Sequence, residues 1–314
     1  MYSINVLIVT YNQENLIGRA LDSILCQKGW GLKSIVISDD CSPDGTWDVL
    51  QKYAREYPDI VKPYRNKQNL GIYGNTEALY KVRGEADLYT ELAGDDVICN
   101  GWFKAVQEYL EKRNINLNGI AATICSDYKI IRPNGMSLIN RNNRLVENGL
   151  DVLSLRFRGL VSSRSTLFTK ETANRFKPIN TSFGLCRAES EADSRVFLYS
   201  DAFYYIPFVA SIYYSQLGVS TRLSSEQYFK DRIEACDWAK EYYRLNDKAK
   251  ASLDFSKTHY QFQIDPSWAN LRRMWSYYWK AFDRYTLSGL NKVTHPLMWF
   301  RSLKAIFSKY SNNS

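Results

Sequence analysis

The sequence lacks closely spaced cysteines and long apolar runs. Its six cysteines stand at least 15 residues apart, so there is no CxxC pair and a zinc knuckle is disfavoured. A chain of 314 residues does not need a disulfide framework, so we expect reduced thiols, as in a cytosolic protein. The longest nearly apolar run, residues 204–214, contains Pro207. It is too short to cross a bilayer as a helix, which needs about 20 residues.

Two further signals are missing near the N-terminus. No basic leader precedes the first apolar run, so we expect no signal peptide. No GxGxxG motif follows that run, which argues against an NAD-dependent oxidoreductase. Internal repeats and low-complexity linkers are also absent.

The positive charge of the chain is concentrated at its C-terminus. Lys and Arg number 41 and Asp and Glu 33, which gives a net charge of +8. Residues 268–314 hold eight basic residues and one acid, a net charge of +7, so residues 1–267 carry only +1. Four of the eight tryptophans lie in the same C-terminal stretch. The body is therefore nearly neutral, and the tail is basic and aromatic.

The spacing in this tail predicts amphipathic helices over residues 268–282 and 297–310. Trp268, Leu271, Trp275 and Trp279 recur at helical spacing, with Arg and Lys between them. Basic helices rich in Trp and Phe are typical of a surface that binds anionic lipids. The alternative is a helix packed on the catalytic domain with its basic face in water. We expect no nucleic-acid partner, because the body has no recognised binding motif.

The first 115 residues predict βαβ units. Short β-branched runs alternate with amphipathic stretches of 10–14 residues, a pattern typical of a parallel sheet. The expected strands cover residues 4–9, 34–38, 61–65 and 88–92, and the expected helices cover 14–27, 46–57 and 71–82. A longer strand is expected at 119–131, mixed elements at 150–215, and helices from residue 224 onward.

Acidic residues follow three of the predicted strands. Asp39 and Asp40 come after the second strand, Asp95 and Asp96 after the fourth, and Glu14 after the first. If the strands are parallel neighbours, these groups meet at one edge of the sheet. Such a cluster suits a hard divalent cation that carries a diphosphate. Taken singly, each segment is equally compatible with a helix cap, a turn or a solvated loop.

The combination of these segments resembles glycosyltransferase family 2, an inverting, metal-dependent family with the GT-A fold. Four segments carry the resemblance, in the same order and spacing: Val6–Asn12 with Glu14, Ile35–Thr46, Asn69–Gly71 with Asn75, and Leu92–Asp96. The implied fold class is α/β, the nucleotide-diphospho-sugar transferase fold, with a mostly parallel central sheet flanked by helices. A C-terminal helical extension follows it.

The resemblance implies a role for each matching residue. It assigns Thr10, Tyr11, Glu14, Asp39, Asp40, Asn69 and Asp95 to the donor nucleotide. Asp39 would read the edge of a uracil or other pyrimidine. Asp95 and Asp96 match the end of the family's DxD-type motif and would bind Mg²⁺ or Mn²⁺. The first acid of that motif is replaced by Ala93. Arg222 is a candidate clamp for the diphosphate or an ordinary surface arginine.

The resemblance also implies a catalytic base before a Tyr-Ile-Pro strand. Tyr205-Ile206-Pro207 follows Asp193 at the family spacing, so we expect Asp193 to be the base, with Glu191 second. Glu189 is a third candidate. The alternative is that these acids only form the solvated start of a helix.

We therefore expect three regions: residues 1–115 for the nucleotide sugar, 116–222 for the acceptor, and 223–314 as a helical region with the basic tail. The expected activity transfers one sugar, with UDP as the expected nucleotide. The acceptor is a hydroxyl of a glycan or lipid-linked glycan in bacterial surface polysaccharide synthesis. Residues 271–275 lack the Gln and adjacent Arg-Trp of the QxxRW motif of processive synthases. We expect a cytoplasmic enzyme, peripheral on the membrane.

Two other functions remain open. A sugar nucleotidyltransferase shares a similar architecture, but it would normally carry a Gly-rich loop with Arg and Lys after the first strand. The segment Thr10–Glu14 does not match that loop. A catalytically inactive homologue could act as a glycan-binding or scaffold subunit, and Ala93 is the feature that favours this function.

Overall fold

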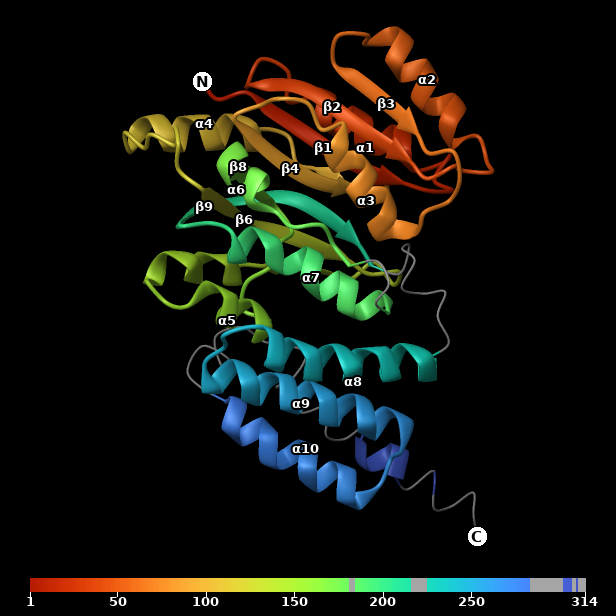
Figure 1. Ribbon diagram of the computed structural model, residues 1–314, viewed down its shortest axis with the longest axis vertical. Coiled ribbons are helices and arrows are strands. Elements are labelled where there is room, and N and C mark those ends of the chain that lie inside the picture. The colour runs from red at the N-terminus through yellow and green to blue at the C-terminus, as the bar shows by residue number, and fades with distance from the viewer. Residues whose placement is uncertain (181–183, 216–224, 283–301, 307–308, 310–314) are drawn as a thin grey trace. The chain divides into compact units, whose positions relative to one another are not determined.

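The computed structural model describes residues 1–180, 184–215, 225–282, 302–306 and 309. These residues form two compact units (Figure 1). The first unit consists of residues 1–148, 163–180 and 195–215, and the second of residues 149–162, 184–194, 225–282, 302–306 and 309.

All the described strands belong to the first unit and form one sheet. They are β1 (Ile4–Thr10), β2 (Leu32–Asp39), β3 (Val61–Arg65), β4 (Leu88–Ala93), β5 (Val97–Ile98), β6 (Ala122–Ile131), β7 (Ser137–Asn140), β8 (Thr166–Thr169) and β9 (Ala202–Tyr214). The order across the sheet is β3-β2-β1-β4-β8-β6-β9-β5, and β7 pairs with β6. The first unit also contains α1 (Ile17–Leu25), α2 (Thr46–Glu56), α3 (Gly71–Lys81), α4 (Trp102–Lys112), the 3₁₀ helix η1 (Asn142–Asn148) and α6 (Lys170–Arg175).

The sheet is mixed. Strands β3, β2, β1 and β4 are parallel neighbours, which confirms the expected βαβ half. The short strand β8 lies antiparallel between β4 and β6 and so interrupts the parallel order. Beyond it β6 and β9 are again parallel. The predicted long strand is β6, and the turn expected at residues 132–135 joins it to β7 as a hairpin, with the Gly135 N–H donating to the Arg132 carbonyl at 2.9 Å.

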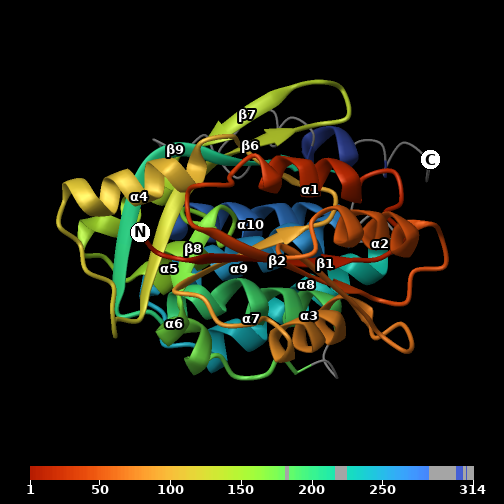
Figure 2. The same cartoon turned by 90° about the horizontal axis from the view of Figure 1, so that it is seen from above.

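Apolar side chains on one face of the sheet form the core. The helix α1 buries Ile17, Leu21 and Ile24 there, and α4 buries Trp102 and Phe103. Figure 2 shows α1 and α4 on one side of β1 and β2, with α3 and α6 on the other. Because β1 is covered on both faces, it is an almost continuous apolar run rather than an alternating one.

The second unit is helical, as expected for the C-terminal region. It contains α5 (Val152–Phe157), α8 (Ser225–Tyr242), α9 (Asp247–Ile264) and α10 (Trp268–Ala281), and the helix α7 (Leu185–Leu198) begins in this unit and ends in the first. Met274 of α10 is fully buried against Phe255 and Phe262 of α9, which holds the first tail helix in the unit.

Helix α10 nevertheless keeps large aromatic side chains at its surface. Trp268, Trp275 and Trp279 are 44%, 45% and 53% exposed. Packing through one face and an aromatic surface on another thus coexist on this helix. Most of the second predicted tail helix, residues 297–310, lies outside the described residues. Within its described part, residues 302–306 are helical. In the described part of the chain no helix has both the length and the hydrophobicity that crossing a membrane requires.

A buried asparagine on α3 joins the carboxyl ends of two strands. The Asn75 Nδ2 donates to the Ser38 carbonyl at 2.9 Å and to the Thr10 carbonyl at 3.4 Å, and its Oδ1 accepts from Asn66 Nδ2 at 2.9 Å. Asn75 is 2% exposed, so water cannot take over the hydrogen bonds that its amide makes to these groups. This one amide therefore fixes the loop that carries Asn66 against the ends of β1 and β2.

We predict that Asn75→Ala destabilises the first unit by about 2–4 kcal/mol, because it leaves buried carbonyl groups without donors. Thr76→Ala on the same helix is the control, since the Thr76 hydroxyl donates an exposed hydrogen bond to the Ile72 carbonyl one turn away within α3. Its effect should stay within about 0.5 kcal/mol. Denaturant unfolding followed by circular dichroism measures both. Equal midpoints for Asn75→Ala and the wild type would contradict this role.

Candidate functional site

The carboxyl ends of β1, β2 and β4 meet at one edge of the sheet. Thr10 lies opposite Asp39, and Val9 lies opposite Ala93, so the three strands end level with one another. Backbone bonds lock the turns that follow: the Asp40 N–H donates to the Thr10 carbonyl at 3.0 Å. The structure therefore brings together the acids that the sequence placed after these strands. We call this set the carboxyl edge: Thr10, Asp39, Asp40, Asp95 and Asp96.

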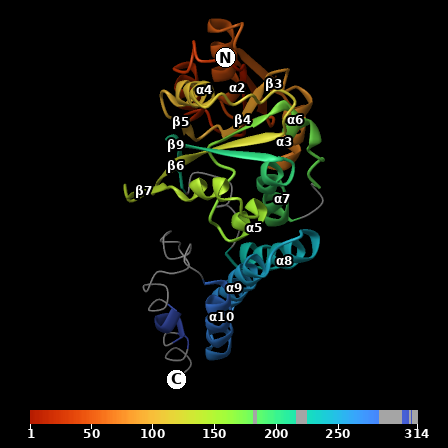
Figure 3. The same cartoon turned by 90° about the vertical axis from the view of Figure 1, so that its left-hand side faces the viewer.

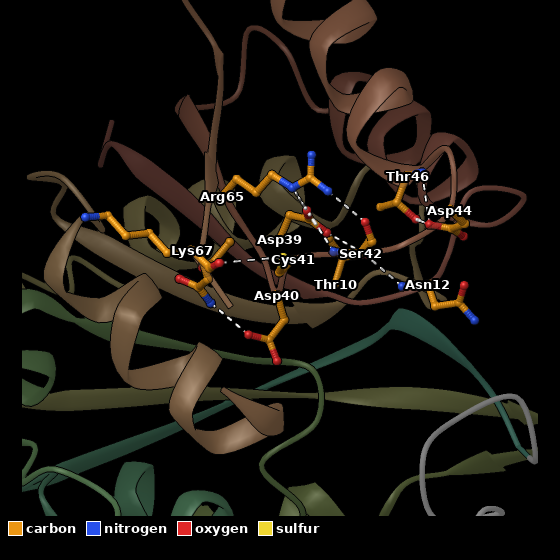
Figure 4. Close-up of polar contacts among 12 residues, drawn as sticks. Thr10, Asn12, Asp39, Asp40, Cys41, Ser42, Asp44, Thr46, Arg65 and Lys67 are labelled. Atoms are coloured by element: carbon orange, nitrogen blue, oxygen red, sulfur yellow. Dashed lines mark hydrogen bonds and ion pairs between the residues drawn. The ribbon is translucent and has the colours of Figure 1, made fainter. Parts of the chain in front are cut away.

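Asp39 is completely buried and has three partners at the end of β2 (Figure 4). It accepts hydrogen bonds from the N–H and hydroxyl of Ser42, and the Arg65 Nε lies 3.2 Å from its Oδ2. Burial raises the pKa of this carboxyl, and the Ser42 bonds and the Arg65 charge oppose that rise. Arg65 also donates to the Ser42 carbonyl at 2.7 Å. Asp39 is therefore held in one orientation, with the positively charged Arg65 guanidinium beside it.

Sequence reasoning missed Arg65. Its signal was its position, because it is the last residue of β3 and pairs in register with Asp39. Parallel neighbours that end together place their final residues side by side. The basic residue of the third strand therefore belongs to the same edge as the acids.

Asp40 and Asn69 organise the loop that leads into α3. The Asp40 Oδ1 accepts from Asn66 Nδ2 at 2.9 Å and from the Leu70 N–H at 2.8 Å. The Asn69 Oδ1 accepts from the Gly71 N–H at 2.9 Å, where the helix begins. Gly71 has a φ of +74°, which favours glycine there. Both predicted donor-binding residues thus have defined partners within the protein.

The loop after β1 is tied to the loop after β2. The Glu14 N–H donates to Asp44 Oδ2 at 3.1 Å, and the Gly45 N–H donates to Glu14 Oε2 at 3.2 Å. The Asn12 N–H donates to the Ser42 hydroxyl at 3.0 Å, and Asn12 adopts a left-handed φ of 56°. Glu14 therefore holds the two loops together, and Tyr11 lies partly exposed between them.

Asp95 and Asp96 lie in a tight turn after β4. Both are buried, at 5% and 7% exposed. A Cβ on Gly94 would come within 2.3 Å of Gln13 Oε1, so a larger residue there would have to displace the Gln13 side chain. Arg19 on α1 donates from Nη2 to the Asp95 carbonyl at 2.6 Å. The carboxylates are thus held close to the loop after β1.

Asp96 has two partners from distant parts of the chain. Its Oδ1 accepts from the Tyr214 N–H at 3.2 Å, and its Oδ2 lies 3.7 Å from Arg164 Nη1. Burial raises the pKa of Asp96 to about 7; the Arg164 charge opposes this and the Asp95 charge adds to it. Arg164 also stacks over the Tyr213 ring at 3.8 Å. No sequence signal marked Arg164, because only the insertion of β8 beside β4 brings it to this edge.

The predicted catalytic acids lie on α7. Asp193 Oδ2 is 3.0 Å from Arg156 Nη2, and the Asp193 side chain is 42% exposed. Glu189 pairs with Arg232. These acids lie beyond the first turn of α7, which begins at Leu185, so their interpretation as a helix start was wrong. Asp193 and Glu191 belong to the second unit and the carboxyl edge to the first.

Two predicted features, the diphosphate clamp and the metal site, have no counterpart among the described residues. Arg222 and the rest of residues 216–224 lie outside the described residues. Among the residues that the structure does describe, no three Asp, Glu, His or Cys side chains form a group arranged to hold a metal ion. Asp95 and Asp96 are adjacent buried carboxylates at the carboxyl edge.

Comparison with solved structures identifies the fold. S. aureus TarS residues 1–349 in complex with UDP-GlcNAc superimposes with a TM-score of 0.59 over 91% of this chain and 83% of that one, at 15% identity. The mannosyltransferase PcManGT from Pyrobaculum calidifontis, in complex with GDP-Man and Mn²⁺, gives a TM-score of 0.55 over 98% and 81%, at 14% identity. Both likenesses concern the fold alone, which is that of GT-A glycosyltransferases.

Sequence relatives cover shorter segments. The putative glycosyltransferase EpsE of Bacillus subtilis is 37% identical over 131 residues, 40% of this chain and 45% of EpsE. The minor teichoic acid biosynthesis protein GgaB of the same organism is 26% identical over 125 residues, 39% of this chain and 14% of GgaB. Uncharacterised mycobacterial proteins, among them Rv1520 of Mycobacterium tuberculosis, are 33% identical over 93 residues. The match to Rv1520 spans 29% of this chain and 26% of that protein, so the chain covers less than half the length of each of these relatives.

The family model for glycosyl transferase family 2 matches residues 5–167, which is 163 of the 314 residues. The matched segment contains the whole carboxyl edge, β2 to β4 and all of β1 except Ile4. This chain therefore belongs to glycosyltransferase family 2.

Proposed function

We propose that this glycosyltransferase transfers a single sugar, with inversion, from a UDP-linked donor to a hydroxyl of a glycan or lipid-linked glycan in bacterial surface polysaccharide synthesis. One observation carries the proposal: a buried carboxylate, Asp39, ends strand β2, and two buried carboxylates, Asp95 and Asp96, follow the parallel strand β4, which ends at the same edge of the sheet. The first suits a nucleobase and the pair suits a metal-bound diphosphate. TarS was solved with UDP-GlcNAc, and GgaB is a teichoic acid biosynthesis protein, which supports the donor and acceptor classes.

The surroundings of Asp39 suit recognition of a pyrimidine. An ionised carboxylate accepts hydrogen bonds only, so it can receive the ring N–H of uracil. Arg65 and Ser42 hold Asp39 in one orientation and favour its charged form. Thr10, Tyr11 and Asn69 line the neighbouring loops and would contact the rest of the nucleoside. Arg222 remains our proposed contact for the diphosphate.

Asp95 and Asp96 fit a divalent cation that is carried in with the donor. Mg²⁺ is usually bound by one or two carboxylates together with substrate phosphates and water, so the replacement of a third acid by Ala93 leaves enough ligands. Burial raises the pKa of Asp96, and repulsion from the charge of the adjacent Asp95 adds to that rise. A cation would relieve that repulsion. When bound, Mn²⁺ or Mg²⁺ would neutralise the charge of the departing diphosphate.

The chemical step then needs a base from this chain. The oxygen of the acceptor hydroxyl forms a bond to the anomeric carbon while the bond from that carbon to the diphosphate breaks, and the hydroxyl proton goes to a carboxylate. We propose Asp193 as that carboxylate, with Glu191 second. Asp193 is partly exposed, and its Oδ2 lies 3.0 Å from Arg156 Nη2, which holds the carboxylate in place. Glu189 is the third candidate and pairs with Arg232.

A catalytically inactive glycan-binding subunit is the second candidate. Ala93 favours it, since the first acid of the usual metal motif is missing. The two functions differ in one measurement: only the enzyme turns over a nucleotide sugar.

We also propose that the enzyme works at the cytoplasmic face of the membrane, with residues 268–310 contributing the contact. The exposed tryptophans of α10 support this part, together with the exposed Arg272, Arg273 and Lys280 on the same helix. Aromatic and basic side chains combined on one helix favour the interface of an anionic bilayer.

The donor and metal assignment is tested by calorimetry with a panel of nucleotide sugars, with and without Mn²⁺. We expect a UDP-sugar to bind in the presence of Mn²⁺ and to be turned over. Asp95→Ala should reduce turnover by about 100-fold or more, because it removes a metal ligand. Asp59→Ala, in the exposed turn before β3, is the control. Wild-type turnover in Asp95→Ala would exclude the metal role, and binding without any turnover in the wild type would favour the inactive subunit.

The raised pKa of Asp96 predicts that the stability of the folded chain depends on pH. Its pKa is about 7 in the folded chain and its ordinary value is 3.8, so the folded chain binds more protons between these values. Its ionisation therefore costs stability as pH rises through that window. We expect Asp96→Asn to raise Tm by several degrees at pH 8 and to leave it nearly unchanged at pH 4. Mn²⁺ with UDP should raise Tm of the wild type at pH 8 but not that of the variant. A lower Tm for the variant at pH 8 would contradict this assignment.

The base is tested by separating binding from transfer. Asp193→Asn should keep UDP affinity within about two-fold and lower transfer by about 10²–10⁴-fold. Glu189→Gln is the matched control, because it disturbs an ion pair on the same helix. Transfer at wild-type rate in Asp193→Asn would move the role to Glu191, which Glu191→Gln then tests. Equal losses in Asp193→Asn and Glu189→Gln would indicate a structural effect instead.

A further inference from the structure

The β6–β7 hairpin, residues 128–140, presents apolar side chains to solvent. Met136, Leu138 and Ile139 are 59%, 50% and 39% exposed. Figure 3 shows the hairpin projecting from the sheet of the first unit. We propose that this hairpin is a lipid-contacting element that binds the surface of an anionic bilayer. This deepens the proposed function, and rests on it only in assigning a lipid-linked acceptor.

Both faces of β7 are apolar at the surface. Leu138 and Ile139 are adjacent on the strand, so their side chains point to opposite faces. A strand on an ordinary sheet buries one face and exposes polar residues on the other. Here Leu138 lies opposite Ile130, and Ile139 lies opposite Lys129. The hairpin therefore places apolar groups on both faces, as insertion into a lipid interface requires.

The positive charge around the hairpin favours an anionic bilayer over a neutral one. Residues 128–146 contain four cations, Lys129, Arg132, Arg141 and Arg144, and the acids Asp127 and Glu147 flank them, so residues 127–147 carry a net charge of +2. Of these cations, Arg132, Arg141 and Arg144 are exposed. Anionic headgroups attract basic residues close to apolar side chains that enter the interface. The combination is complementary to an anionic bilayer.

The hairpin is continuous with the carboxyl edge. Ile130 lies opposite Leu138 on one side and Tyr213 on the other, so the three side chains share one face of the sheet. Tyr213 carries the guanidinium of Arg164, which pairs with Asp96. The apolar face of the hairpin is thus connected to Asp96 through Tyr213 and Arg164. A lipid held at the hairpin would have its headgroup next to the donor, as a lipid-linked acceptor needs.

A second copy of the chain fits this surface less well. Among the described strands β7 pairs with β6 alone, so one edge is available for another strand. Two copies that met there would bring two +2 segments together, which opposes association. We therefore commit to the bilayer and treat a dimer as an outcome of the test.

The test uses the full-length chain and large vesicles of phosphatidylcholine, with or without 30% phosphatidylglycerol, in a co-sedimentation assay. Arg132→Gln/Arg141→Gln should weaken binding to the anionic vesicles by about 30-fold, at about five-fold for each cation. Lys104→Gln/Lys112→Gln is the matched control, with the same charge change at two exposed lysines of α4. Leu138→Gln/Ile139→Gln should also weaken binding, and Ile120→Gln, exposed before β6, should not. All variants should keep the wild-type Tm.

Each outcome decides the proposal separately from the proposed function, because the assay needs no turnover. Loss of binding in both hairpin variants and in neither control supports it. Retained binding in the hairpin variants overturns it, even if Arg272→Gln/Arg273→Gln on α10 releases the protein. Absence of wild-type binding to anionic vesicles also overturns it. A wild-type dimer in light scattering that Leu138→Gln converts to a monomer overturns it in favour of a second copy.

Discussion

The parallel register of β1 with β2 and β4 is the constraint on which the site depends. Thr10 opposite Asp39 and Val9 opposite Ala93 make three chain segments end at the same level. A shift of one residue in either pairing would turn the alternating side chains to the opposite face and separate the acids. Apolar packing of α1 and α4 on one face of these strands holds that register. The energy that positions the polar edge therefore comes from the core behind it.

The carboxyl edge brings several buried carboxylates together, and the groups that compensate the negative charge differ from one carboxylate to the next. Asp39 has a guanidinium and a serine beside it, while Asp40 receives hydrogen bonds from Asn66 and the Leu70 N–H. Asp96 is less compensated, since Arg164 lies 3.7 Å away and burial raises its pKa to about 7. Buried carboxylates whose charge is only partly compensated are typical of functional sites, where groups that bind a ligand lower the stability of the fold.

Exposed basic and apolar side chains occur together at two separate locations in the chain. The basic tail includes α10, which packs on α9 through Met274 and still exposes its tryptophans. The β6–β7 hairpin is basic and apolar as well, and it belongs to the first unit. If both contact lipid, the body and the tail reach the membrane independently. A nearly neutral net charge over residues 1–267 concealed the hairpin, because acids elsewhere cancel its cations.

Sequence alone determined the βαβ half, its strand ends, the family and the acids Asp39 and Asp96, since apolar periodicity and short-range turn chemistry are local properties. Tertiary structure decided the remainder. Arg164 reaches Asp96 only because β8 inserts antiparallel beside β4, a long-range pairing that no local pattern records. Arg65 becomes a partner of Asp39 through the register of β3. The pKa of Asp96 likewise depends on burial by distant segments, and that is why its charge could not be judged from its neighbours in sequence.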